Sequence, residues 1–125
     1  MRAALIIASL ALAGSHFAGP ASAQTPATSG YSAKDLLAPC QEADSDARNG
    51  VFAEAECEQY ISGYVDALQA VGAKADLDIC VPEQNTADEV RWAFTRWMHA
   101  SYSARTKMSA SEALMGALKE NFPCN

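Results

Sequence analysis

The four cysteines are the residues of this 125-residue chain best suited to chemistry, and they are Cys40, Cys57, Cys80 and Cys124. Such a set could bind zinc, exchange electrons or form disulfides. Zinc and redox sites both favour a C-x-x-C pair, and the sequence contains none. An even number of well-separated cysteines in a short exported chain is typical of disulfides. We therefore expect two disulfides, no metal site and no cofactor, provided that the chain is exported.

The beginning of the chain has the layout of a secretory signal peptide. Arg2 precedes an apolar run that is too short to span a bilayer, and residues 21–23 form an A-x-A signal before Gln24. We expect residues 1–23 to be removed on export by cleavage before Gln24. No later stretch approaches the roughly 20 apolar residues that a membrane span needs, so the sequence predicts an exported protein without one.

The other candidates for catalysis have no evident partners. Ser62 is not part of a G-x-S-x-G nucleophile elbow. His99 is the one histidine outside residues 1–23, and near the end of a predicted helix it complements the helix dipole. The formal net charge of −6 argues against nucleic acid, because affinity for phosphates comes from Lys and Arg. We expect no catalytic residue and no nucleic-acid partner, and we infer that the protein works by binding.

Four helical patterns and no convincing strand follow a polar leader at residues 24–31, so residues 32–125 predict one all-α domain. It should be a small, disulfide-stapled bundle of about four helices. The patterns cover approximately residues 32–38, 51–71, 86–99 and 109–122. Pro39 ends the first pattern, and Asn49-Gly50 predicts a turn before the second. Thr86 and Ser109, each followed by Glu three residues later, predict capping boxes for the last two.

The apolar faces of these helices predict the core of the domain. Six residues should be buried together: Tyr64, Leu68, Phe94, Trp97, Leu114 and Leu118. Gly63, in the middle of the second helix, is unfavourable there compared with alanine. We therefore expect another helix to approach closely at Gly63.

Helix geometry ranks the three possible disulfide pairings. Short connections make successive helices antiparallel neighbours, so the second helix should carry the chain from Cys57 to the opposite end of the bundle. About 22 Å of helix would separate Cys57 from Cys80, whereas a disulfide needs Cα atoms within about 7 Å. The expected pairs are Cys40–Cys57 and Cys80–Cys124. The second pair closes the longer loop, so we expect it to contribute more stability.

The order of the motifs also resembles a known family. "LLAPC", "CEQYISGYVDAL", "CVPEQNTADEV" and "ALKENFPC" follow one another between Asp35 and Cys124. This order is similar to that of the Rap/Tai immunity proteins, which neutralise type VI secretion amidases. The resemblance implies a periplasmic protein of Gram-negative bacteria, often a homodimer, that binds a peptidoglycan amidase effector. It would block the amidase by occluding the active-site cleft, and it would catalyse no reaction itself.

One segment departs from the family pattern and is our candidate for the partner-binding site. The family commonly has His-Pro at the end of the third helix, where this chain has "HASYSARTKM". We expect the partner to contact four residues of this segment: His99, Tyr102, Arg105 and Lys107. The acidic loop around Asp44 and Asp46 is the rival surface, suited to steering a basic partner.

Two other classes of protein remain open at this point. An acid-activated periplasmic chaperone of the HdeA/HdeB group would also be small, exported and helical. Those chaperones have a single disulfide, whereas this chain has four cysteines. An orphan structural or ligand-carrying helical domain is the third alternative.

Overall fold

The computed structural model describes residues 30–45 and 48–124, so the predicted signal peptide and its cleavage site lie outside the described residues. In the described ranges the chain forms only helices and two isolated β-bridges, and the fold is all-α as predicted. The helices are α1 (Ala33–Glu42), α2 (Arg48–Ala70), α3 (Ala73–Asp76), α4 (Thr86–Ala100), α5 (Tyr102–Arg105) and α6 (Ala110–Asn121). The sequence predicted the four longer helices and missed the one-turn helices α3 and α5.

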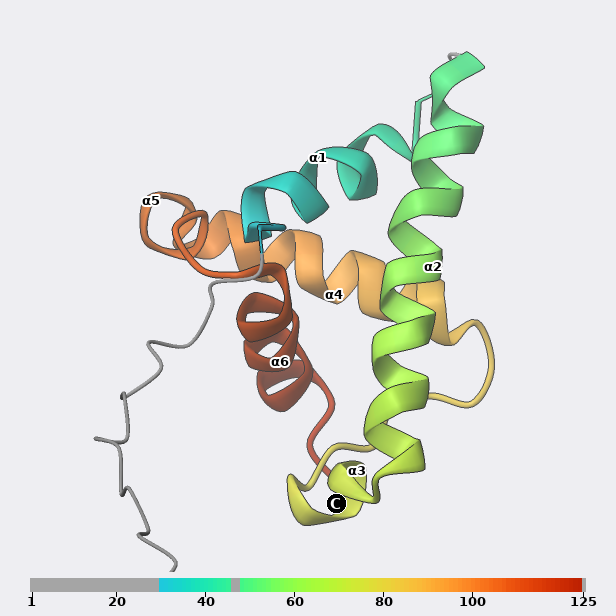
Figure 1. Ribbon diagram of the computed structural model, residues 1–125, viewed down its shortest axis with the longest axis vertical. Helices are drawn as coiled ribbons and strands as arrows, with labels where there is room; N and C mark the ends of the chain where they lie inside the picture. Colours follow the sequence, from blue (N-terminus) through green and yellow to red (C-terminus); the bar gives the residue numbers. More distant parts are fainter. Residues whose placement is uncertain (1–29, 46–47, 125) are drawn as a thin grey trace, which may run out of the picture.

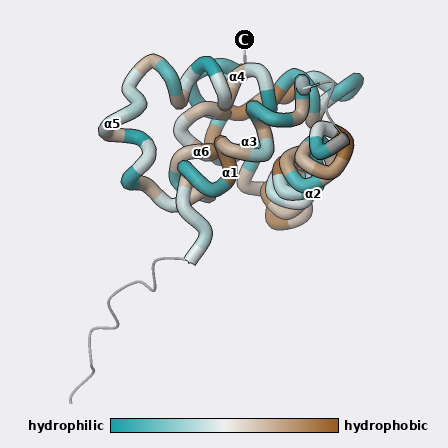
Figure 2. The backbone as a smooth tube through the Cα atoms, turned by 90° about the horizontal axis from the view of Figure 1, so that it is seen from above, coloured by the Kyte–Doolittle hydropathy of each residue, from teal (hydrophilic) through white to brown (hydrophobic). Residues whose placement is uncertain are grey.

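The longer helices cross one another and do not run side by side as antiparallel neighbours. In Figure 1, α2 runs along the molecule, while α1 and α4 lie across it and α6 lies below α4, to the left of α2 in this view. Seen from above in Figure 2, α5 projects on the side of the molecule opposite α2. The assumption of antiparallel helices was therefore wrong, although the two ends of α2 are far apart as expected.

The core lies where α1, α2, α4 and α6 meet. Its largest fully buried side chains include Leu36, Leu37, Ile61, Phe94, Met98, Leu114 and Leu118. The predicted burial of Phe94, Trp97, Leu114 and Leu118 is confirmed. Tyr64 and Leu68 are only partly buried, because the buried face of α2 passes through Val65.

Helix α1 continues through Pro39, so the prediction that it ends there was wrong. A proline has no N–H and leaves the carbonyl four residues earlier without its helical hydrogen bond. Here that carbonyl belongs to Asp35, and the hydroxyl of Tyr31 shares its one proton between it, at 3.3 Å, and Glu56 Oε1, at 3.0 Å. Ser32 caps the start of α1 in a capping box with Asp35. The hydroxyl of Tyr31 therefore takes the place of the N–H that proline lacks, and the helix continues past Pro39.

The predicted turn at Asn49-Gly50 is also wrong, because both residues belong to the first turn of α2. Gly50 is needed for a different reason. A Cβ atom there would lie 2.2 Å from the carbonyl oxygen of Ser45, so only glycine lets the backbone of Ser45 lie so close.

The close helix approach predicted at one glycine occurs at another. Gly63 has nothing within 4 Å of a Cβ position, so no helix approaches it and that prediction was wrong. The close approach occurs at Gly116 of α6, where a Cβ would lie 2.7 Å from the ring of Trp97.

Only one of the two predicted capping boxes forms. The Ser109–Glu112 box at the start of α6 is confirmed, with both reciprocal hydrogen bonds present. Thr86 is instead the first residue of α4, after Asn85 in the left-handed conformation (φ 53°), and its hydroxyl donates to the carbonyl of Pro82 at 2.6 Å. Thr86 therefore stabilises the preceding turn.

The structure joins Cys40 to Cys57 and Cys80 to Cys124, the same pairs that helix geometry predicted. The first disulfide links α1 to α2 within the core, where the two cysteines are 1% and 0% exposed. The second disulfide lies at the opposite end of α2 from the first, and two backbone hydrogen bonds join the same segments. Cys80 N donates to the carbonyl of Phe122 at 2.8 Å, and Cys124 N donates to that of Asp78 at 3.2 Å. The segment after α6 is thereby fixed to the segment after α3.

Candidate partner-binding surface

Three of the four predicted partner-binding residues lie exposed at the end of α4 and around α5. The rings of His99 and Tyr102 stack with their centroids 6.1 Å apart, and Lys107 is exposed after α5. The side-chain amide nitrogen of Gln41 lies 2.7 Å from His99 Nε2. If the amide donates this hydrogen bond, His99 Nε2 accepts and the proton of the neutral ring is on Nδ1. The contact ties this surface to α1.

Arg105 occupies a different environment, because its guanidinium is bound within the molecule. Its Cζ lies 3.6 Å from the centroid of the Trp97 ring, and Nη1 donates to the carbonyl of Trp97. Its Nη2 lies 3.8 Å from Glu120 Oε2, which also accepts a 2.7 Å hydrogen bond from Trp97 Nε1. Arg105 therefore fastens α5 to α4 and α6. Any effect of Arg105 on a partner would act through the position of its neighbours.

Two further residues, Trp92 and Arg96, belong to the same surface and were not predicted from the sequence. Spacings of four and three residues place Trp92, Arg96 and His99 on one exposed face of α4. Tyr102 extends that face onto α5, and Trp92 and Tyr102 are 47% and 46% exposed. We call these four residues the α4–α5 stripe. The helical spacing that unites them is visible in the sequence, but their exposure is not.

The composition of the α4–α5 stripe suits a protein interface. Trp, Tyr and Arg dominate the binding energy of interfaces where they have been measured. The Cζ of Arg91 lies 5.1 Å from the centroid of the Trp92 ring and supports it from the same helix. A stripe carried mainly by a 15-residue helix loses little conformational freedom on binding.

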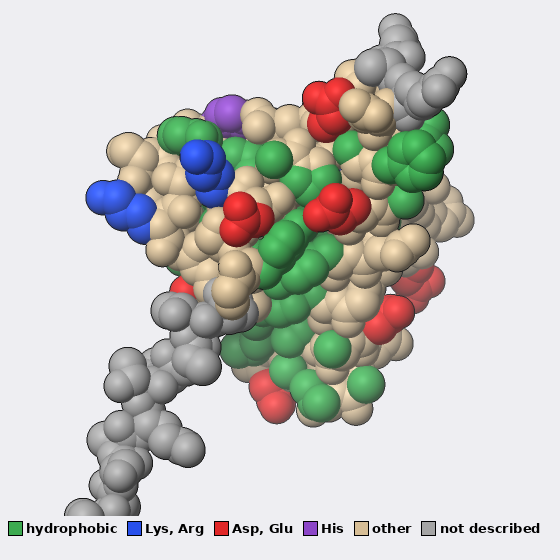
Figure 3. Space-filling model, turned by 45° about the horizontal axis from the view of Figure 1, so that its top comes forward, with side chains coloured by type: hydrophobic (Ala, Val, Ile, Leu, Met, Phe, Trp, Pro, Cys, Tyr) green, Lys and Arg blue, Asp and Glu red, His purple; other side chains and the backbone are tan. Residues whose placement is uncertain are grey.

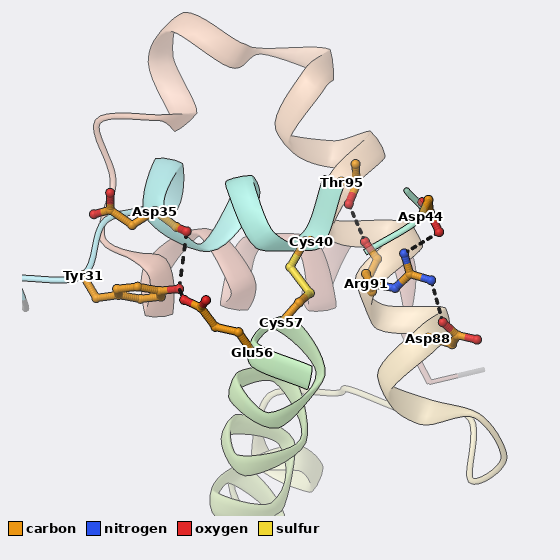
Figure 4. The surroundings of a disulfide bond; sticks show 9 residues. All are labelled: Tyr31, Asp35, Cys40, Asp44, Glu56, Cys57, Asp88, Arg91 and Thr95. Carbon is orange, nitrogen blue, oxygen red and sulfur yellow. Dashed lines mark hydrogen bonds and ion pairs between the residues drawn. A yellow bond between two sulfur atoms is a disulfide. The ribbon is translucent and has the colours of Figure 1, made fainter. Parts of the chain in front are cut away.

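The rival acidic loop is bound to the molecule at Asp44, as Figure 4 shows. Arg91, only 5% exposed, makes ion pairs of 2.9 Å with Asp44 and 2.7 Å with Asp88. Burial lowers the pKa of Arg91, but its hydrogen bonds to Asp88 and Asp44 raise it on balance. The charge of Asp44 is thus engaged with α4, and Asp46 lies outside the described residues.

The thiols and acidic groups form no evident reaction centre in the part of the chain that the structure describes. There, no three His, Cys, Asp or Glu side chains come together so as to hold a metal ion. The four cysteines are all in disulfides. Within residues 30–45 and 48–124, no helix has both the length and the apolar character required to cross a membrane.

The domain is small, helical and disulfide-linked, and one face presents aromatic and cationic side chains, features that suit a protein-binding domain. The chain is a member of the Rap1a immunity proteins, since the model of that family matches residues 32–124. Comparisons with curated proteins and with solved structures find no match. Membership implies an immunity function exercised by binding a cognate effector. Members of the family are generally periplasmic and generally not enzymes.

Proposed function

We propose that this protein is a periplasmic immunity protein that binds and blocks a peptidoglycan amidase effector of a type VI secretion system. Family membership over residues 32–124 supports an immunity function. The amidase target rests on the resemblance of the four cysteine-containing motifs to the Rap/Tai proteins. The protein acts by occluding the active-site cleft of the effector and contributes no catalytic group.

The observation that carries the proposal is the α4–α5 stripe at the projecting side of the molecule. A cleft is best blocked by a convex element, and α5 projects from the helical core in both Figure 1 and Figure 2. The contacts of Arg105 with Trp97 and Glu120 hold this element in place before binding. Pre-organisation of this kind reduces the entropy lost on association.

A rescue experiment tests the proposal. Expression of the full coding sequence should protect cells that receive the cognate amidase in the periplasm. Arg96→Ala/Tyr102→Ala should abolish protection and leave the melting temperature unchanged, because both side chains are exposed. The matched control is Val71→Ala/Lys119→Ala, which removes one exposed apolar and one exposed cationic side chain elsewhere. Full protection by the first variant would remove the α4–α5 stripe from the interface.

Export and assembly are part of the same proposal. Intact-mass measurement of periplasmic protein should give a chain that begins at Gln24 and lacks four hydrogens, one pair for each disulfide. The family resemblance also implies a homodimer, which sedimentation velocity would detect as a doubled mass. A chain that retains residues 1–23 would contradict export by cleavage.

A further inference from the structure

A second surface lies between α1 and the first half of α2. Two shallow hollows of about 460 and 430 Å³ meet there, and Glu56 lines both of them. The first is lined mainly by Pro39, Glu42 and Phe52, and the second by Tyr31, Gln59 and Tyr60. We call the two hollows together the α1–α2 groove.

The walls of the α1–α2 groove are aromatic. The rings of Tyr31 and Tyr60 lie 5.4 Å apart, tilted by 35°, and pack against the core from outside. Phe52 is 73% exposed at the other end of the groove, so its ring contributes little to the fold. The ring is accessible to a partner that occupies the hollow.

The charge of the α1–α2 groove is negative. Glu42 and Glu56 are both exposed, and none of the described residues lining either hollow is Lys or Arg. Tyr31 donates a 3.0 Å hydrogen bond to Glu56 Oε1, as Figure 4 shows, and so orients this carboxylate. Burial and the neighbouring Glu56 raise the pKa of Tyr31 to about 12. In Figure 3, acidic side chains border a hydrophobic band on this face, while the blue cationic side chains in view lie on the side of α5.

The geometry points to the α1–α2 groove as a docking site for an arginine-bearing segment of a partner protein. The guanidinium would pair with Glu56 and lie against the Tyr31 and Tyr60 rings, because Arg combines carboxylate hydrogen bonds with stacking on aromatic faces. An apolar neighbour of that arginine would contact Pro39 and Phe52. Charge complementarity favours this occupant over a second copy that brings its own α1–α2 groove to this one, since Glu42 and Glu56 of the two copies would then repel each other. The site goes beyond the proposed function and needs no effector to be tested.

Peptide titration observed by ¹⁵N–¹H NMR tests the site on protein made from the full coding sequence. The probe is acetyl-Phe-Arg-amide, and its neutral control is acetyl-Phe-citrulline-amide, which has nearly the same shape. The arginine probe should shift the amide signals around Glu56 and Tyr60, and the citrulline probe should bind about tenfold more weakly. Glu56→Gln should lower the affinity for the arginine probe about tenfold and retain an acceptor for Tyr31. Glu83→Gln, an exposed acid outside the groove, should leave the affinity unchanged.

Three results would overturn the inference. Equal shifts with the two probes would show that charge does not decide binding. No shift at the groove up to the solubility limit of the arginine probe would show that the surface does not accept this segment. Groove signals that change with protein concentration alone would assign the surface to contacts between copies of the chain.

Discussion

Removal of the Cys40–Cys57 disulfide should cost more stability than removal of Cys80–Cys124, although it closes the shorter loop. The sequence separations of 17 and 44 residues correspond to about 3 and about 4 kcal/mol of lost chain entropy. Packing reverses this order. Cys40 and Cys57 lie in the core, so Cys40→Ala/Cys57→Ala also leaves a cavity worth about 2 kcal/mol, or about 1 kcal/mol per buried sulfur. Cys80 is exposed and Cys124 half-buried, so we expect losses of about 5 and about 4 kcal/mol respectively.

Urea unfolding of the two double variants measures these losses. Reduction provides the control, because it breaks the cross-link and keeps the sulfur atoms in place. Reducing the Cys80→Ala/Cys124→Ala variant should cost about 3 kcal/mol for the remaining Cys40–Cys57 link, compared with about 5 kcal/mol for its replacement by alanine. The reasoning fails if the Cys80–Cys124 variant is the less stable of the two, or if reduction and alanine substitution cost the same.

The remaining predictions concern packing and pH. Gly116→Ala should lower the free energy of unfolding by about 1–3 kcal/mol, because its Cβ would lie 2.7 Å from the Trp97 ring. Gly63→Ala, which meets nothing within 4 Å, should raise it by up to about 1 kcal/mol, and thermal melts of both variants would show whether the signs differ. Trp97→Ala should cost about 3–5 kcal/mol because the ring is buried; an unchanged melting temperature would contradict that burial. Side-chain hydrogen bonds from the N-cap serines lower the pKa of Asp35 and Glu112, so their stabilisation is present above an unfolded pKa of about 4 and is lost as the pH falls through the lower folded values. Asp35→Asn/Glu112→Gln should therefore flatten the loss of stability in acid, as measured by urea unfolding at several pH values, and an unchanged pH profile would exclude this contribution.

Sequence motifs predicted the helix ends correctly where residues close together along the chain decide the local structure. The Ser109–Glu112 capping box formed because its donors and acceptors are three residues apart on the same chain segment. The same pattern at Thr86 forms no capping box, because Asn85 adopts the left-handed conformation and the Thr86 hydroxyl donates to the carbonyl of Pro82. Pro39 does not end α1 as predicted, because the hydroxyl of Tyr31, eight residues before Pro39, donates to the carbonyl of Asp35.

The candidate site was predicted less completely, because it depends on contacts between distant residues. His99 and Tyr102 could be chosen from the segment that departs from the family pattern. The role of Arg105 could not, since it follows from Glu120, which reaches the Trp97 ring from another helix. The exposure of Trp92 likewise depends on which face of α4 meets the core. Neither the role of Arg105 nor the exposure of Trp92 could be predicted without knowing how the helices pack.

The pairing of the cysteines has a consequence for how the molecule matures. Each disulfide joins two cysteines that are consecutive along the sequence, Cys40 with Cys57 and Cys80 with Cys124. A chain that crosses a membrane from its amino end exposes these thiols in that same order. An oxidase that couples thiols as they emerge would then produce the native pairs directly. Maturation of the exported chain proposed above should require an oxidase and no disulfide isomerase.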